Sequence, residues 1–229
     1  MFFSFLTTLL IGTSSGNSQW FLNTDFEKKP KFTTNVFTTV TATLQNWNWT
    51  PIGNYINTDT NSVAYNNIAL DAPAVTLQGT NSPYDPAIQG NYSVLLQGGS
   101  FAIPQSEAGA SISQTGEIPP GTESIMYWVK QTAFYANETF QMTFNGQPLP
   151  SIVTSSTANY NVYAADISAD SGQTGLLQFS VPWQTAFMID NIQFSDSPIP
   201  EPSDLALIAF VVVVFGIYRW QHKIKSHSH

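Results

Sequence analysis

Short hydrophobic runs, several of them alternating apolar and polar residues, recur between Trp20 and Pro198. Gly, Pro, Asn and Asp, which favour turns, separate these runs, and no stretch has the spacing of a convincing amphipathic helix. The pattern predicts an all-β domain, because many short strands at such spacing form a β-sandwich or barrel. The predicted strands are Val36–Leu44, Tyr92–Gln97, Ser124–Lys130, Thr139–Phe144, Leu176–Val181 and Phe187–Phe194.

Three local patterns refine this prediction. Asn145-Gly146 is a hairpin turn signal, and Pro148 just after it indicates that the returning strand is short or lies at an edge. Residues Ile125–Val129 are apolar on both faces, which predicts a central strand covered on both sides, with Trp128 in the core. The stretch Gly79–Gly90 contains Pro83 and Pro86 and is predicted to be a long exposed loop.

Composition restricts the possible partners and chemistry. The chain has no cysteine, its charged residues amount to 10%, against about 25% in typical soluble domains, and its formal net charge is −8. The basic residues between Trp20 and Pro198 are Lys28, Lys29, Lys31 and Lys130. Nucleic acid is therefore not an expected partner, since phosphate binding needs a basic face, whereas cations suit the acidic balance.

The C-terminal segment combines a short polar motif with an apolar run and a basic end. Pro200-Glu201-Pro202-Ser203 is followed by an apolar helix predicted over residues 205–220 and a basic tail over 219–229 that carries Arg219, Lys223 and Lys225. Such a helix, roughly 24 Å long, is short for a hydrocarbon core of about 30 Å. Basic residues beyond an apolar segment keep that end in the cytoplasm.

This arrangement resembles the sorting signal of the bacterial PEP-CTERM proteins, over about the last 30 residues. The basic residues here are interspersed with Gln221, His222 and Ile224, where the family commonly has a compact arginine run. The resemblance implies that the tail is handled by exosortase and anchors the chain only transiently in the inner membrane. A permanent single-pass anchor and a helix buried in a globular core are the alternatives.

The other terminus resembles a secretory signal. Met1–Ile11 is almost wholly apolar and Gly12–Ser18 is small and polar, although no Lys or Arg precedes Lys28; a buried first strand is the alternative. We therefore expect a signal-like segment over residues 1–19, an ectodomain over 20–197 and the sorting signal over 198–229. The product is expected in the cell envelope or the extracellular matrix.

Four segments of the ectodomain resemble the galactose-binding-like jelly roll of many carbohydrate-binding modules. The resemblance implies an antiparallel jelly-roll β-sandwich, with its first and last strands adjacent. The four segments are Asn23–Glu27, Gly90–Leu96, the stretch from Ile112–Gln114 to Tyr127–Val129, and Phe187–Ile192.

In such modules a structural calcium ion often sits where the start of the chain meets its last strand, and this role carries over to Glu27 and Asp190. Period-two alternation also predicts that Asp190 shares a face with Met188, Ile192 and Phe194. A carboxylate among apolar neighbours needs a cation or several hydrogen-bond donors, and calcium prefers oxygen ligands. Backbone N–H donors at a loop edge are the alternative for Asp190.

Candidate glycan-binding residues are aromatic, because sugars present C–H patches to flat rings. Trp47 and Trp49 alternate with polar residues, so in an extended segment both rings point the same way. They form either a stacking platform or part of the inward face of a sheet. Tyr84 in the proline-containing loop and Trp183 after Pro182 are better placed for exposure.

Enzymatic chemistry finds little support. His222, His227 and His229 all follow the apolar run, so neither a histidine-based triad nor a histidine metal site is expected in the ectodomain. Carboxylate-dependent action on glycosides is a remote alternative. We expect a non-catalytic module that binds a glycan or exopolysaccharide, or alternatively a structural coat or biofilm matrix protein without a specific ligand.

Overall fold

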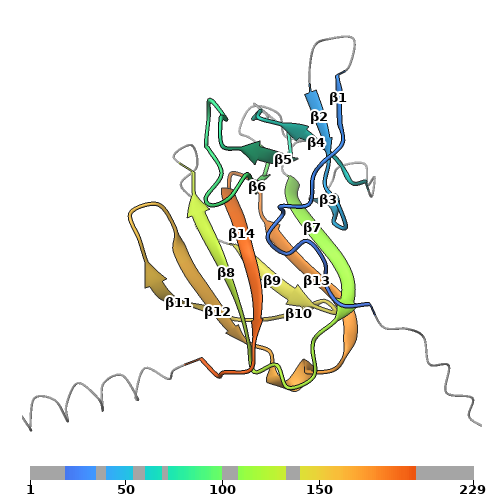
Figure 1. The fold of residues 1–229 in the computed structure, drawn as a ribbon, viewed down its shortest axis with the longest axis vertical. Coiled ribbons are helices and arrows are strands. Elements are labelled where there is room, and N and C mark those ends of the chain that lie inside the picture. The colour runs from blue at the N-terminus through green and yellow to red at the C-terminus, as the bar shows by residue number, and fades with distance from the viewer. Residues whose placement is uncertain are drawn as a thin grey trace, which may run out of the picture.

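The computed structural model describes residues 19–34, 40–53, 60–68, 72–99, 108–132 and 140–199. These residues form two β-sheets that face each other, together with a short 3-10 helix, η2 (Ser168–Asp170) (Figure 1). The prediction of an all-β sandwich is confirmed. The predicted C-terminal helix lies outside the described residues.

The larger sheet has nine strands in the order β1-β2-β4-β5-β6-β14-β8-β12-β11. Its neighbouring strands are antiparallel except for β4 and β5, whose parallel pairing departs from the predicted antiparallel arrangement. The strands are β1 (Phe32–Thr34), β2 (Val40–Thr43), β4 (Ser62–Tyr65), β5 (Ala74–Gly79), β6 (Tyr92–Gln97), β8 (Ser124–Gln131), β11 (Ser151–Ser156), β12 (Asn161–Asp166) and β14 (Ala186–Ser195).

The smaller sheet has five strands in the order β10-β9-β13-β7-β3, all antiparallel to their neighbours. Most of its outward side chains are small or uncharged polar ones, because serine, threonine, asparagine and glutamine alternate with the buried apolar positions. The strands are β3 (Asn48–Gly53), β7 (Ala108–Glu117), β9 (Gln141–Phe144), β10 (Gln147–Pro148) and β13 (Thr174–Val181).

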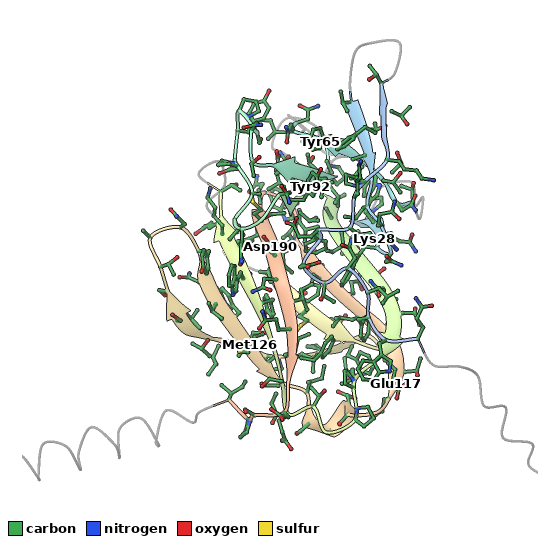
Figure 2. The ribbon with its side chains drawn as sticks, in the orientation of Figure 1. Lys28, Tyr65, Tyr92, Glu117, Met126 and Asp190 are labelled. Carbon is green, nitrogen blue, oxygen red and sulfur yellow. The ribbon has the colours of Figure 1, made fainter. Side chains whose placement is uncertain are left out.

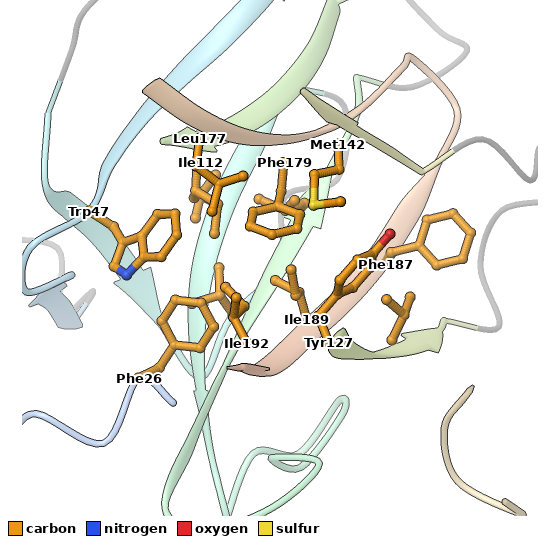
Figure 3. Close-up of a cluster of buried hydrophobic side chains, with 14 of the residues drawn as sticks. Phe26, Trp47, Ile112, Tyr127, Met142, Leu177, Phe179, Phe187, Ile189 and Ile192 are labelled. Atoms are coloured by element: carbon orange, nitrogen blue, oxygen red, sulfur yellow. The ribbon is translucent and has the colours of Figure 1, made fainter. Parts of the chain in front are cut away.

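The hydrophobic core fills the space between the two sheets (Figure 3). Trp47 packs there against Phe26 and Phe179, with ring centroids 5.8 and 6.2 Å apart. The buried members of this cluster run from Phe21 to Ile192, so segment 19–199 holds both sheets and a hydrophobic core of its own. A segment with its own core is expected to fold independently.

The start of the described chain lies against the last strand. Ile192 donates its N–H to the Thr24 carbonyl at 2.9 Å, and Phe21 stacks on Phe194 with centroids 5.4 Å apart. The contact is made by the segment before β1, since β1 itself lies at the far edge of the larger sheet. The prediction that the start of the chain lies beside the last strand is thus confirmed. The predicted pairing of the first strand with the last one is not found among the described residues.

The predicted hairpin is confirmed. Asn145 and Gly146 connect β9 to β10 and have φ angles of 50° and 77°, the left-handed values that these two residue types tolerate. Strand β10 has two residues, ends with Pro148 and lies at the edge of its sheet. Proline is compatible with this position because an edge strand need not donate every N–H to the ladder.

Candidate functional site

Strand β8 lies between β14 and β12 in the larger sheet, so its side chains alternate between the core and the outer face. Tyr127 and Val129 are buried in the core, whereas Met126, Trp128 and Lys130 are half-buried on the outer face (Figure 2 labels Met126). The predicted central strand is confirmed, but its expected cover is incomplete. The prediction that Trp128 belongs to the core is wrong.

Trp128 is the centre of an aromatic and apolar surface on this outer face. Its indole stacks on the ring of Tyr160, with centroids 4.5 Å apart and 14° between the planes. Tyr160 directly precedes β12, whose Val162 is the register partner of Trp128. We call Met126, Trp128, Tyr160 and Val162 the outer platform. All four side chains are half-buried, so each keeps surface in contact with solvent.

Two shallow hollows lie at the ends of the outer platform. One, of about 400 Å³, is lined by Met126, by Gln193 of β14 and by the turn Pro119–Thr122. The other, of about 260 Å³, is lined by Tyr160, by Lys130 and by residues 157–159. The apolar surface is therefore flanked by amide, hydroxyl and ammonium groups that can make hydrogen bonds.

The loop between β5 and β6 is linked to the Lys130 end of the platform. Lys130 Nζ lies 2.8 Å from Asp85 Oδ1. Tyr84, the residue before Asp85, is 45% exposed, which agrees with its predicted exposure. The ion pair thus brings an exposed aromatic residue of the loop to the same end of the sandwich as the second hollow.

Trp47 and Trp49 do not form an exposed pair. Trp47 is completely buried and donates its Nε1–H to the Asn23 carbonyl at 3.1 Å. Trp49 is partly buried, packs against the core and donates to the Ser62 carbonyl at 3.0 Å. Both rings point inward, so of the two alternatives left open by the sequence the structure matches the inward face of a sheet and not a stacking platform.

Trp183 is 39% exposed in the turn between β13 and β14, as its position after Pro182 predicts. This turn contributes no residue to the outer platform, and Trp183 lines neither of the two hollows described above. An exposed ring outside a lined hollow is a poorer candidate for recognising a sugar than a ring at the edge of one.

Glu27 and Asp190 hold the segment that enters β6. Glu27 Oε1 accepts the N–H groups of Asn91 and Tyr92 at 2.6 and 3.1 Å, and its Oε2 accepts the Asn91 side-chain amide at 2.8 Å. Gly90 has φ of 61°, and a side chain there would collide with the Glu27 carboxylate. This close approach explains the glycine.

Asp190 is almost fully buried, on the outer face of β14 (Figure 2). Its Oδ2 accepts the Ser93 hydroxyl at 2.7 Å and the Gln89 N–H at 3.3 Å, while its Oδ1 accepts the Asn191 N–H at 2.7 Å. These donors match the alternative in which loop-edge groups satisfy Asp190.

The face assigned to Asp190 from its sequence neighbours needs one correction. A bulge between Asp190 and Gln193 interrupts the pairing with β8, and Asn191 within it has φ of 49°. The bulge turns Ile192 into the core, whereas Asp190 shares the outer face with Met188. Alternation fails here because a bulge inserts an extra residue into one strand.

The pKa of Asp190 follows from this position. Burial raises the pKa of its carboxyl to about 7, and the negative charge of Glu27 acts in the same direction. The hydrogen bonds from Ser93, Asn191 and Gln89 oppose that rise. A buried carboxylate near a second carboxylate gains from a cation, and carboxylate oxygens are ligands that calcium prefers.

Among the described residues, Glu27 and Asp190 do not belong to a larger acidic cluster. The part of the chain that the structure describes contains no group of three or more His, Cys, Asp and Glu side chains able to hold a metal ion. Any ion bound by Glu27 and Asp190 would therefore need its remaining ligands from backbone carbonyls, amide oxygens or water.

The predicted sorting signal lies outside the described residues. This applies to Pro200, Glu201, Pro202 and Ser203, to the apolar run, and to Arg219, Lys223 and Lys225. The signal-like segment is likewise outside them, up to residue 18. Within the described ranges, no helix has the length and apolarity needed to cross a membrane.

Comparison with known proteins finds no matching family model and no matching curated protein. Among solved structures, the family 11 carbohydrate-binding module from Clostridium thermocellum, in complex with a beta-1,3-1,4-mixed-linked tetrasaccharide, is 8% identical with a TM-score of 0.35; the match covers 68% of this chain and 92% of that one. The active domain of tailspike protein 4 of bacteriophage CBA120 is 19% identical with a TM-score of 0.36, over 66% of this chain but only 19% of that one.

Proposed function

We propose that the domain is a non-catalytic carbohydrate-binding β-sandwich of the jelly-roll type, which binds a glycan or exopolysaccharide on the outer platform. The observation that carries this proposal is the stacked pair of Trp128 and Tyr160 on an outer sheet face. Two stacked rings that keep solvent-exposed surface beside polar groups offer flat apolar faces to a ligand, which supports a binding role.

The surroundings of the pair suit a sugar. A pyranose offers C–H groups that pack on aromatic rings and hydroxyls that need hydrogen-bond partners at their rim. The Lys130 ammonium and the Asn159 amide lie at one end of the outer platform, and the Gln193 amide lies at the other. A chain of several sugar units could run along β8 and use both ends.

The test is a glycan-array screen of segment 19–199, followed by calorimetry with any glycan that binds. Trp128→Ala is expected to weaken binding by roughly tenfold or more, since an aromatic stack contributes about 1–3 kcal/mol. Trp183→Ala is the matched control, because it removes an exposed tryptophan away from the platform. Equal losses in the two variants, or no saturable binding by the folded domain, would refute the proposal.

We further propose that the chain is exported and that exosortase processes it through Pro200–Ser203 and the apolar run. The order of motif, apolar run and basic tail supports this. Glu201→Ala is expected to leave an unprocessed chain in the inner membrane, as judged by intact mass and cell fractionation. Glu123→Ala in the ectodomain is the control. Wild-type mass and location in the Glu201→Ala chain would contradict the proposal.

A calcium ion bound by Glu27 and Asp190 is a separate proposal. It is supported by the burial of Asp190 and by the absence of a cationic partner for either carboxylate among the hydrogen bonds described above. Calcium is expected to raise the melting temperature of segment 19–199 relative to chelator, and this shift should vanish in Asp190→Asn. If calcium leaves the melting temperature of the wild type unchanged, hydrogen bonds alone satisfy the carboxylates of Glu27 and Asp190.

A structural coat or matrix role is the second candidate. It is favoured by the outer face of the smaller sheet, where Asn48, Ser113, Gln178 and Thr143 are successive register partners across four strands. Glu117 is the one charged residue in the five strands of this sheet. Weak, uniform adhesion to many surfaces, unchanged by Trp128→Ala, would favour this role over a specific glycan site.

A further inference from the structure

The two sheets have four edge strands, and three of these carry features that hinder further pairing. A free sheet edge exposes unpaired N–H and C=O groups, which can pair with a strand of another molecule. Strand β1 has three residues and follows three closely spaced lysines, while β10 has two residues and contains Pro148. Strand β3 contains Pro51, and its Trp49 exchanges backbone hydrogen bonds with Thr60.

Strand β11 has none of these features. It is six residues long, contains neither proline nor charge, and is exposed along all but its first residue. Ile152 and Val153 are 46% and 47% exposed, which is unusual for neighbouring β-branched residues with high strand propensity. An uncharged edge with exposed apolar residues is a type that natural proteins normally protect, and the protective feature that β11 does carry is its bulge between Val153 and Ser155.

The edge is also held in a defined position. β11 pairs with β12 over its whole length, apart from a bulge between Val153 and Ser155. At its start, the Ser151 hydroxyl accepts a hydrogen bond of 2.7 Å from the buried Tyr127. An ordered edge loses less conformational entropy on pairing than a mobile one would.

The distribution of charged residues favours a second copy of the chain as the partner of this edge. No Asp, Glu, Lys or Arg occurs between Gln141 and Ala165, in a chain whose formal net charge is −8. Two copies therefore repel each other over much of their surface but meet no like charges along β11. In an antiparallel pair of β11 strands, every cross-strand neighbour is an uncharged residue in any register.

We propose that β11 is a self-association edge, at which two copies of the chain pair their β11 strands antiparallel across a twofold axis. Such an interface uses the same surface on both copies and closes on itself, so it yields a dimer and not a filament. Backbone hydrogen bonds would supply the pairing and the exposed Ile152 and Val153 would supply apolar burial.

The dimer does not depend on the proposed glycan site, but its effect on glycan binding rests on that site. The larger sheets of both copies would join into one, with their outer faces on the same side. Val162 lies on β12, the strand next to β11, and Tyr160 directly precedes it, so the two outer platforms would lie near each other. Two linked sites raise the avidity for a repeating polysaccharide.

Cysteine cross-linking tests the pairing in the full chain, because the natural sequence has no cysteine. Ile152→Cys, Val153→Cys and Thr154→Cys are made in turn and oxidised at low concentration. Near the twofold axis, like residues come within disulfide reach, so at least one variant should form a covalent dimer several-fold faster than Ile52→Cys. Ile52 is the matched control, since it is 40% exposed on the edge strand β3.

Sedimentation analysis of segment 19–199 provides the second measurement. The mass is expected to rise from monomer to dimer with concentration, and Ile152→Lys and Val153→Lys should each weaken the dimer by roughly tenfold. Both positions are exposed, so circular dichroism should show intact folds. A monomer at every concentration, or cross-linking no faster than in Ile52→Cys, overturns the proposal even if glycan binding is found.

Discussion

The outer faces of the two sheets differ although both cover the same core. On the larger sheet, β8 contributes Met126 and Trp128, and Tyr160 just before β12 stacks on Trp128, beside the ion pair of Lys130 and Asp85. On the smaller sheet, successive strands contribute mainly serine, threonine, asparagine and glutamine, with the exposed aliphatic side chains of Ile52 and Leu176 and no aromatic ring. The comparison teaches that one core can support a face with stacked aromatic rings and a face that is mostly uncharged and polar.

The largest expected effect separates the tryptophan of the core from the tryptophan of the outer platform. Trp47→Ala should lower the free energy of unfolding by about 3–5 kcal/mol, because it removes a completely buried ring and leaves a cavity. Trp128→Ala should lower it by about 1 kcal/mol or less, since its ring is half-buried on the surface. Chemical denaturation of both variants checks this. Similar losses would mean that Trp128 belongs to the core after all.

The next effect concerns the buried carboxylate of the larger sheet. Folding raises the pKa of Asp190 from 3.8 to about 7, so between these values the folded state binds more protons than the unfolded state. Without calcium, stability should therefore rise as the pH falls from about 7.5 to about 5, by a few kcal/mol at most. Thermal melts in chelator check this, and Asp190→Asn should flatten that part of the profile. A wild-type profile as flat as that of the variant would contradict the burial argument.

A third test places the same charge on each outer face. Met126→Lys should weaken glycan binding by roughly tenfold, because it adds a flexible cation to an apolar ligand surface. Gln178→Lys on the smaller sheet should leave the affinity unchanged, since the described strands of that sheet present no aromatic side chain on this face. Calorimetry with the glycan identified for the wild type provides the measurement. Equal losses would show that the ligand does not distinguish the faces.

The smallest effect is expected from the ion pair beside the platform. Lys130→Met should cost about 1 kcal/mol or less, because the Lys130 and Asp85 side chains are still 28% and 14% exposed and solvent screens them. The loss should shrink at high salt. Lys29→Met at an exposed position is the control, and urea unfolding at two salt concentrations is the measurement. A salt-independent loss would indicate lost packing of the lysine stem instead.

Much of the fold could be predicted from sequence because its signals are local. The boundaries of β6 match the predicted Tyr92–Gln97, and Asn145-Gly146 forms its hairpin. Local patterns failed where a distant contact decided the outcome. The bulge at Asn191 moved Asp190 to the opposite face from Ile192, and the strands β11 and β12 were not predicted at all.

The candidate site was predicted less well than the fold. The sequence left Trp47 and Trp49 open between a platform and an inward face and placed Trp128 in the core, whereas the structure buries Trp47 and leaves Trp128 half-buried. A strand that is apolar on both faces was the available signal for Trp128. It could mean either complete cover or a ligand surface, and hydrophobicity alone does not distinguish these two uses.

The sequence by itself determined the β class, the turns and the uncharged, cysteine-free surface, because alternation, φ preferences and composition act over a few neighbouring residues. Only the tertiary structure decided which aromatic residues are buried, that Tyr160 meets Trp128, and that Glu27 and Asp190 hold one loop. These outcomes depend on strand order and register, which bring together residues tens of positions apart in the chain.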